Sequence, residues 1–92
     1  MAHCQPEDLQ DLRAVFEELR HWPGLKEKKT GTFYLRGKGF LHFHIKGERR
    51  WADIRDGQDW GEPFDLTMPA DSDLQALFLA ELGRRFAVTA AA

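Results

Sequence analysis

The fold is decided by the stretch TFYLRGKGFLHFHIKGERRWADIR, residues 32–55. Apolar and polar residues alternate along three runs in it, 32–36, 40–46 and 50–55. A period of two is typical of strands with one buried face, and a glycine-bearing turn separates each run from the next. The stretch therefore predicts an antiparallel meander.

Further elements follow on both sides of these three strands. A fourth alternating run, 63–68, extends the meander, and Pro63 suits an edge strand. Apolar residues at helical spacing predict helices over 6–22 and 72–87, and the alanine-rich tail 88–92 is expected to fray. We therefore predict a single α+β domain, a four-stranded antiparallel meander with an N-terminal and a C-terminal helix packed on one face.

Each predicted helix carries an apolar stripe that can cover the sheet. In the first helix the stripe is Leu9, Leu12, Val15, Phe16 and Leu19, and in the second it is Leu74, Leu77, Phe78, Leu82 and Phe86.

The turns predict how the strands pair. A three-residue loop at 37–39 would place Tyr34 directly across from His42. A two-residue turn at 47–48 puts glycine first, as a type II′ turn requires, and would place His42 across from Asp53. Directly opposed side chains have Cβ atoms about 4.5–5.5 Å apart, so these three groups are expected to touch.

This register divides the side chains between two faces of the sheet, and two helices are expected to cover only the apolar one. The covered face is predicted to hold Phe33, Leu35, Leu41, Phe43, Ile45, Ala52, Ile54, Phe64 and Leu66. The open face is predicted to hold Thr32, Tyr34, Arg36, Phe40, His42, His44, Trp51, Asp53 and Arg55, with Thr32, His44 and Trp51 in one row.

Two imidazoles and a carboxylate on the open face form a candidate metal site. His42, His44 and Asp53 suit zinc or another divalent first-row metal. Acid–base chemistry is an alternative, in which Asp53 orients His42 and Tyr34 donates a proton. An ordinary ladder of polar cross-strand neighbours is the third interpretation, and the sequence leaves all three open.

Aromatic side chains on an uncovered face indicate a contact surface. Trp51 and Phe40 there suggest either a ligand cleft or a homodimer formed through the open sheet face. The residues predicted to bind a ligand are Tyr34, His42, His44, Trp51, Asp53 and Arg55. The alternative is that Trp51 is half-covered by Arg36, Arg55 and Trp60.

Composition excludes several classes. The 92 residues carry a net charge of −2, so no global charge attracts nucleic acid or an acidic membrane. No apolar run is long enough to span a bilayer, no signal peptide is expected, and the one cysteine, Cys4, favours the cytoplasm.

Charge is nevertheless divided along the chain. Residues 20–50 hold nine cations and two acids, while residues 51–73 hold seven acids and one arginine. The cations expected at one end of the sheet are Lys26, Lys28, Lys29, Lys46, Arg49 and Arg50. Nucleic-acid binding at this basic end is the least favoured function, because acids of the second helix are expected nearby.

Three segments, Phe33 to Gly37, Phe40 to His44 and Ala52 to Arg55, resemble a bacterial and fungal family labelled "luciferase domain". The shared features are a strand, a His-x-His strand and an Ala-Asp-hydrophobic strand, and the resemblance implies no light-emitting reaction. The order of helix, Trp22-Pro23-Gly24-Leu25 and strand is also similar to the MmcQ/YjbR-like α+β domains.

The sequence therefore predicts a small cytoplasmic binding module whose open sheet face holds a small ligand, a metal or a second copy of the chain. A hydrolase-like enzyme, using a metal or a His42–Asp53 acid–base pair, is the alternative.

Overall fold

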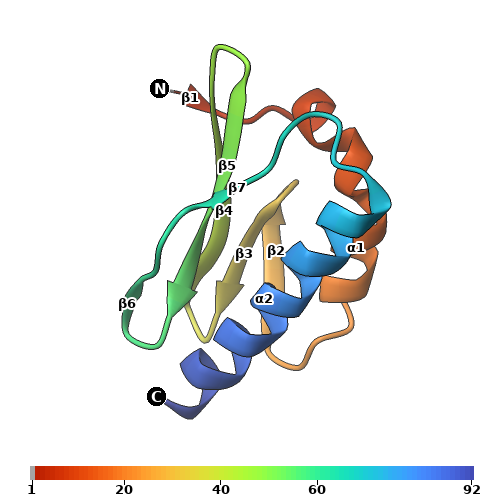
Figure 1. Ribbon diagram of the computed structural model, residues 1–92. Helices are drawn as coiled ribbons and strands as arrows, with labels where there is room; N and C mark the ends of the chain where they lie inside the picture. The colour runs from red at the N-terminus through yellow and green to blue at the C-terminus, as the bar shows by residue number, and fades with distance from the viewer. Residues whose placement is uncertain (1) are drawn as a thin grey trace.

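The computed structural model describes residues 2–92 and is an α+β fold, as predicted. The chain begins with a short strand, a 3-10 helix and a helix, continues through the sheet and ends in a long helix (Figure 1). The helical elements are η1 (Pro6–Leu12), α1 (Arg13–Leu19) and α2 (Ser72–Ala91). The strands are β1 (Ala2–His3), β2 (Leu25–Lys29), β3 (Thr32–Leu35), β4 (Lys38–Lys46), β5 (Arg49–Asp56), β6 (Asp59–Trp60) and β7 (Phe64–Asp65).

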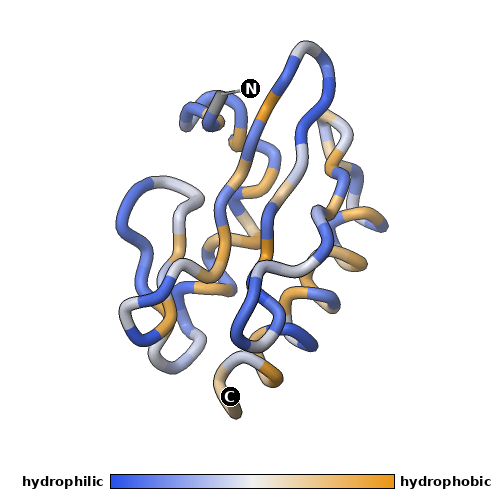
Figure 2. The backbone as a smooth tube through the Cα atoms, turned by 90° about the vertical axis from the view of Figure 1, so that its left-hand side faces the viewer, coloured by the Kyte–Doolittle hydropathy of each residue, from blue (hydrophilic) through white to orange (hydrophobic). Residues whose placement is uncertain are grey.

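The strands form one antiparallel sheet in the order β2-β3-β4-β5-β6. On one side of β4, β3 pairs with its first half and β1 with its second half, while β6 and β7 pair with the two halves of β5. Both helices lie on the same side of the sheet (Figure 1), and Figure 2 views the molecule from the opposite, uncovered side.

The predicted number of four strands is too low. Strand β2 has one apolar residue, Leu25, followed by four charged ones, and this composition suits an exposed sheet edge but gives no alternating pattern. Strands β1 and β6 are two residues long, too short for any period. The predicted strand 63–68 is also shorter, since only Phe64–Asp65 are in strand conformation.

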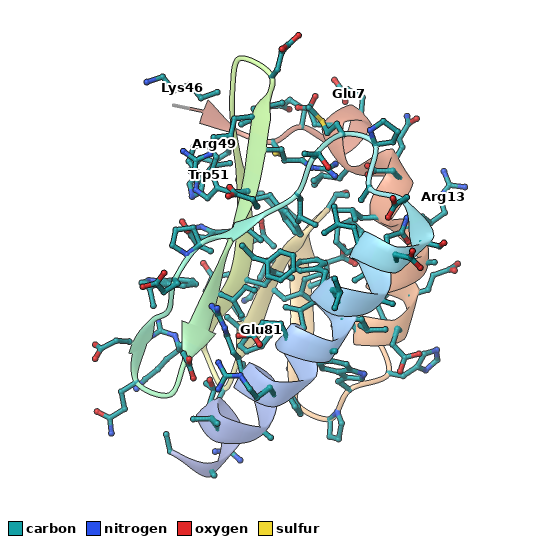
Figure 3. All side chains as sticks on the ribbon, in the orientation of Figure 1. Glu7, Arg13, Lys46, Arg49, Trp51 and Glu81 are labelled. Carbon is teal, nitrogen blue, oxygen red and sulfur yellow. The ribbon has the colours of Figure 1, made fainter. Side chains whose placement is uncertain are left out.

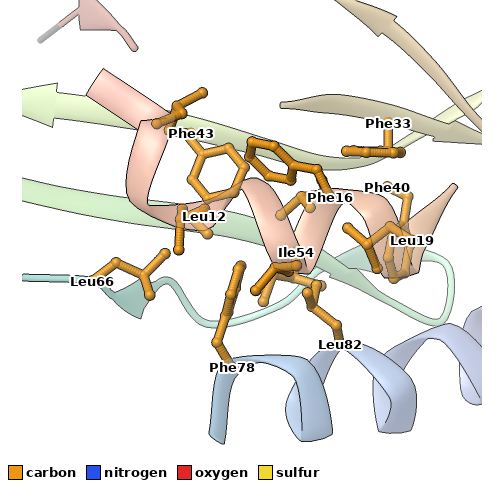
Figure 4. Close-up of a cluster of buried hydrophobic side chains, with 14 of the residues drawn as sticks. Leu12, Phe16, Leu19, Phe33, Phe40, Phe43, Ile54, Leu66, Phe78 and Leu82 are labelled. Atoms are coloured by element: carbon orange, nitrogen blue, oxygen red, sulfur yellow. The ribbon is translucent and has the colours of Figure 1, made fainter. Parts of the chain in front are cut away.

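The hydrophobic core fills the space between the sheet and the helices (Figure 4). Phe16 of α1 packs on Phe33 and Phe43 of the sheet. Phe78 of α2 also packs on Phe43, so both helices contact the same sheet residue. The predicted stripe of the second helix is wrong at Leu77, which is 64% exposed.

The hairpin between β4 and β5 has the predicted two-residue turn at Gly47-Glu48. Gly47 has a φ of 61°, as the first turn position of a type II′ turn requires. The register that follows, with His42 opposite Asp53 and His44 opposite Trp51, is confirmed.

The hairpin between β3 and β4 differs from the prediction. Its turn is Arg36-Gly37, with φ values of 55° and 82°, and positive φ at both positions is the signature of a type I′ turn. Tyr34 therefore lies opposite Gly39, and the predicted pairing of Tyr34 with His42 is wrong.

A β-bulge at Phe40 is the reason that β4 still presents His42 to the uncovered face. The pairs Phe33–Leu41 and Tyr34–Gly39 leave Phe40 as an extra residue in β4. Phe40 is fully buried and packs edge-on against Phe86 of α2. Its predicted place on the open face is therefore wrong.

The ends of the helices also differ from the predicted bounds. The first helix is 3-10 over Pro6–Leu12 and becomes α-helical from Arg13 to Leu19. Helix α2 is capped by Asp71, whose Oδ1 accepts a hydrogen bond from the main-chain nitrogen of Leu74 at 2.8 Å.

The predicted fraying over 88–92 is wrong as far as Ala91, since α2 reaches that residue. The Thr89 hydroxyl accepts a hydrogen bond from the Gly57 N–H, and Arg36 donates to the carbonyl oxygen of Ala90. These contacts fasten the last turns to the sheet. Across residues 2–92, the structure contains no helix with the length and apolar character needed to cross a bilayer.

Candidate metal centre

Two histidines and an aspartate meet on the uncovered face. His42 and His44 are two residues apart on β4, so both side chains leave the same face, and Asp53 lies opposite His42 on β5. Asp53 Oδ2 is 3.2 Å from His42 Nε2 and 2.9 Å from His44 Nε2. One carboxylate oxygen therefore touches both rings.

A third histidine, His3, completes the cluster from strand β1. His3 pairs with His44, and its ring centroid lies 4.9 Å from that of His44 and 5.9 Å from that of His42. One nitrogen from each of the three rings can be chosen so that all lie within 4.8 Å of one another.

The sequence pattern does not predict His3 as a site residue. This residue occupies the position beside His44 where the predicted register put Thr32. Strand β1 is two residues long and carries no periodic signal. The histidine content of the chain is the one feature of the sequence that could have indicated His3. The chain has four histidines, and only His21 lies outside the cluster.

Burial differs within the cluster: His44 is buried, at 7% exposed, His42 and Asp53 are half-buried, and His3 is exposed. Burial lowers the pKa of His42 below its ordinary value, and the positive charges that His44 and His3 can carry lower it further, against the opposing effect of Asp53. His42 is therefore neutral at neutral pH, the form in which an imidazole nitrogen has a lone pair for a metal.

Two tryptophans frame the histidines. The Trp51 ring stacks on His44 with centroids 5.5 Å apart, and the Trp60 ring stacks on His42 at 4.7 Å. Figure 3 shows Trp51 and Arg49 on the side of the sheet away from α2. Arg49, rather than the expected Arg36, Arg55 and Trp60, lies over the Trp51 ring, at 4.8 Å from its centroid.

Two other predicted site residues lie beside the cluster. Arg55 donates hydrogen bonds to the carbonyl oxygens of Gly39 and Gln58 and lies over the Trp60 ring. Its guanidinium group is therefore held by these contacts at the C-terminal end of β5. Tyr34 does not face His42 across the strands, but both residues line the same cavity.

This cavity has a volume of about 550 Å³ and lies next to the histidines. One wall comes from the segment from His3 to η1, the other from β2, β3 and their turn, and β4 forms the floor. The space exists because β1 and β3 pair with different halves of β4 and leave a gap between them.

Two of the spacings in the cluster, those from Asp53 to His42 and to His44, match the ligands of a tetrahedral metal ion. Bonds of about 2.0–2.1 Å place the ligand atoms of a tetrahedral zinc ion roughly 3.3 Å apart. The Asp53 oxygen lies 2.9 Å and 3.2 Å from the Nε2 atoms of His44 and His42, close to that spacing. Without a metal, the same arrangement is a carboxylate in close polar contact with two imidazoles.

A comparison of the chain with protein-family models, curated proteins and solved structures gives no match. The resemblances to the "luciferase domain" family and to the MmcQ/YjbR-like domains stay predictions.

Proposed function

We propose that this protein binds one divalent first-row metal ion, with zinc as the best candidate, through His3, His42, His44 and Asp53. One observation carries the proposal. Three imidazoles from two strands offer ligand atoms within 4.8 Å of one another, and a carboxylate oxygen lies within 3.2 Å of two of them.

The ligand types select the metal. Three nitrogen donors and one oxygen donor match zinc and its first-row neighbours, whereas magnesium and calcium prefer sites made of oxygen atoms. The Asp53 carboxylate carries one negative charge. The metal-loaded site therefore has a lower net positive charge than a divalent ion held by three neutral imidazoles alone. Burial and the neighbouring imidazoles disfavour protonation of His42, so a metal ion at this site does not have to displace a proton from that ring.

An ordinary ladder of polar neighbours explains the cluster less well. Such a ladder needs only the cross-strand pair of His42 and Asp53. It gives no reason for His44 to be buried against the same carboxylate, or for His3 to arrive from another strand.

Metal-assisted hydrolysis is a second candidate function. The cavity of about 550 Å³ is lined by His3 and His42, so a substrate in it would lie against the proposed ion. A metal ion in such a position supplies Lewis-acid chemistry and lowers the pKa of a bound water. The chain's own residues would position the substrate.

The uncovered face also supports self-association as a homodimer, because Trp60 is 43% exposed beside His42. The single Cys4 supports a cytoplasmic location.

Native mass spectrometry with a zinc titration tests the proposed function and reports the subunit number in the same measurement. We expect one zinc ion per chain, and a His44→Ala variant to bind it at least about 100-fold more weakly, the upper end of what loss of an outer-shell partner costs. His21→Ala is the matched control, because His21 is exposed and lies outside the cluster.

A spectroscopic readout locates the ion. Nickel or copper bound at the cluster would quench the fluorescence of Trp51 and Trp60, which stack on two of the ligands, more strongly than that of Trp22. The double variant Trp51→Phe with Trp60→Phe should keep the ion and lose most of the quenching. Absence of zinc binding, or equal weakening by His21→Ala, would overturn the proposal.

A further inference from the structure

We infer that the cavity beside the histidines binds a small organic phosphate, with its phosphate group between Lys28, Lys29 and the metal ion. The contact with the metal rests on the proposed function, whereas the contact with the lysines does not. The cavity is open to solvent and has about 550 Å³, within the range of roughly 300–1,000 Å³ typical of small-ligand sites.

The charge of the lining points to an anion. Lys28 and Lys29 both line the cavity, and no aspartate or glutamate does, among residues 2–92. Threonine and tyrosine hydroxyl groups and the Gln5 amide supply further donors. Two lysines and a divalent ion match the two negative charges of a phosphate monoester better than the single charge of a carboxylate.

The carboxylates nearest to these lysines along the chain are already engaged. Glu27 accepts a hydrogen bond from Arg20 at 2.7 Å and another from the Gly31 N–H at 3.1 Å. On the opposite wall, Asp8 accepts from the Gln5 N–H at 2.9 Å. These partners offset the acids, so the lysines remain a source of positive potential in the cavity.

The other surfaces of the cavity suit the organic part of such a ligand. Leu9 and Phe43 contribute apolar lining beside Pro6. Tyr34 contributes its ring, and Lys28 Nζ lies 5.5 Å from the centroid of that ring, a cation–π distance that places the ammonium group at the cavity wall. A small phosphate ester can therefore bury its carbon atoms while its phosphate reaches the lysines.

Titration of the zinc-loaded protein with phenyl phosphate, followed by amide NMR signals, tests this inference. We expect the signals of Gly31 and Thr32, which line the cavity, to shift most. The double variant Lys28→Gln with Lys29→Gln should bind phenyl phosphate at least about 10-fold more weakly, which is the effect of roughly 1.4 kcal/mol. Lys26→Gln is the matched control, since Lys26 is exposed on the same strand but does not line the cavity.

The outcomes separate this inference from the proposed metal site. The lysine double variant should still bind one zinc ion, and a loss of zinc affinity in His44→Ala should leave the lysine-dependent part of phenyl phosphate binding in place. Equal affinity in the double variant and the wild type, or equal weakening by Lys26→Gln, would overturn the inference. Benzoate binding as tightly as phenyl phosphate would overturn the assignment to phosphate.

Discussion

Arg50 of β5 is 1% exposed and forms a two-pronged ion pair with Asp11 of η1. Its Nη1 and Nη2 each donate to one carboxylate oxygen of Asp11, both at 2.8 Å. The sequence predicts Arg50 in a group of cations at one end of the sheet, and the structure shows that this member of the group is buried rather than free to bind a partner. Asp11 faces an opposing effect of burial, but the hydrogen bonds from Arg50 and from the Ala70 N–H hold its pKa below the usual range.

This pair joins three parts of the chain around one buried guanidinium group. Arg50 also donates to the carbonyl oxygens of Asp8 and Leu66, and Asp11 accepts from the Ala70 N–H at 2.7 Å. The pair therefore fixes η1 against β5 and against the segment that leads into α2. Because only Cys4 and Gln5 separate His3 from η1, the same contacts stabilise the wall of the cavity and the strand that carries the third histidine.

Replacement of Asp11 by alanine should strongly destabilise the fold. Removal of one partner leaves the buried Arg50 charge uncompensated, which typically costs about 3–5 kcal/mol. Urea unfolding should show this loss, while Asp65→Ala should change the free energy of unfolding by less than about 1 kcal/mol, because the Arg49–Asp65 pair is exposed. Similar losses in the two variants would contradict a structural role for the buried pair.

Zinc should raise the thermal unfolding midpoint of the protein, and His3→Ala should remove most of that rise. A ligand that binds only the folded state stabilises it by about 2.7 kcal/mol at 100 times its Kd. His3 is exposed, so the variant without metal should unfold at nearly the wild-type temperature. Differential scanning calorimetry with zinc and with a chelator checks this, and a full rise in His3→Ala would exclude His3 as a ligand.

Substitution of Gly31 by alanine should destabilise the fold more than substitution of Gly37. Both glycines have positive φ, 79° and 82°, so both variants carry backbone strain of about 1 kcal/mol or more. Only at Gly31 would the new Cβ meet the core, at 2.7 Å from Leu9 Cδ1 and 3.2 Å from Phe43 Cδ1, whereas nothing lies within 4 Å at Gly37. Chemical denaturation of the two variants measures the difference, and equal losses would refute the close packing at the cavity wall.

Glu81 should contribute stability at neutral pH that disappears in acid. Hydrogen bonds from Arg84 and then Arg85 lower the pKa of Glu81 from 4.5 to about 2. The folded state therefore holds the carboxylate ionised where the unfolded chain takes up a proton, so the contribution is complete above pH 4.5 and is lost as the pH falls towards about 2.

The difference in unfolding free energy between the wild type and Glu81→Gln should therefore shrink steadily across that pH range. Urea titrations at several pH values measure it, with Glu48→Gln, in the exposed turn between β4 and β5, as the control. A difference that stays constant with pH would show that the ion pairs of Glu81 do not stabilise the fold.

The sequence by itself determined the parts of the structure that local pattern controls. Alternation over 40–46 and 50–55, with glycine first in the turn between them, was sufficient to place His42 opposite Asp53 and His44 opposite Trp51. The register of this hairpin follows from the turn and from the need to bury one face, and a slip by one residue would expose the core. Three of the four proposed ligands, His42, His44 and Asp53, were predictable for this reason.

Only the tertiary structure decided the rest, because those features depend on contacts between distant residues. The bulge that turns Phe40 into the core depends on Phe86, far along the chain in α2. Arg50 can be buried because the Asp11 carboxylate of η1, distant in the sequence, forms an ion pair with it. His3 reaches the cluster because β3 pairs with only half of β4 and leaves hydrogen-bonding groups free for β1. A two-residue strand has no period to read, so the third histidine and the cavity beside it emerge only when the whole chain is folded.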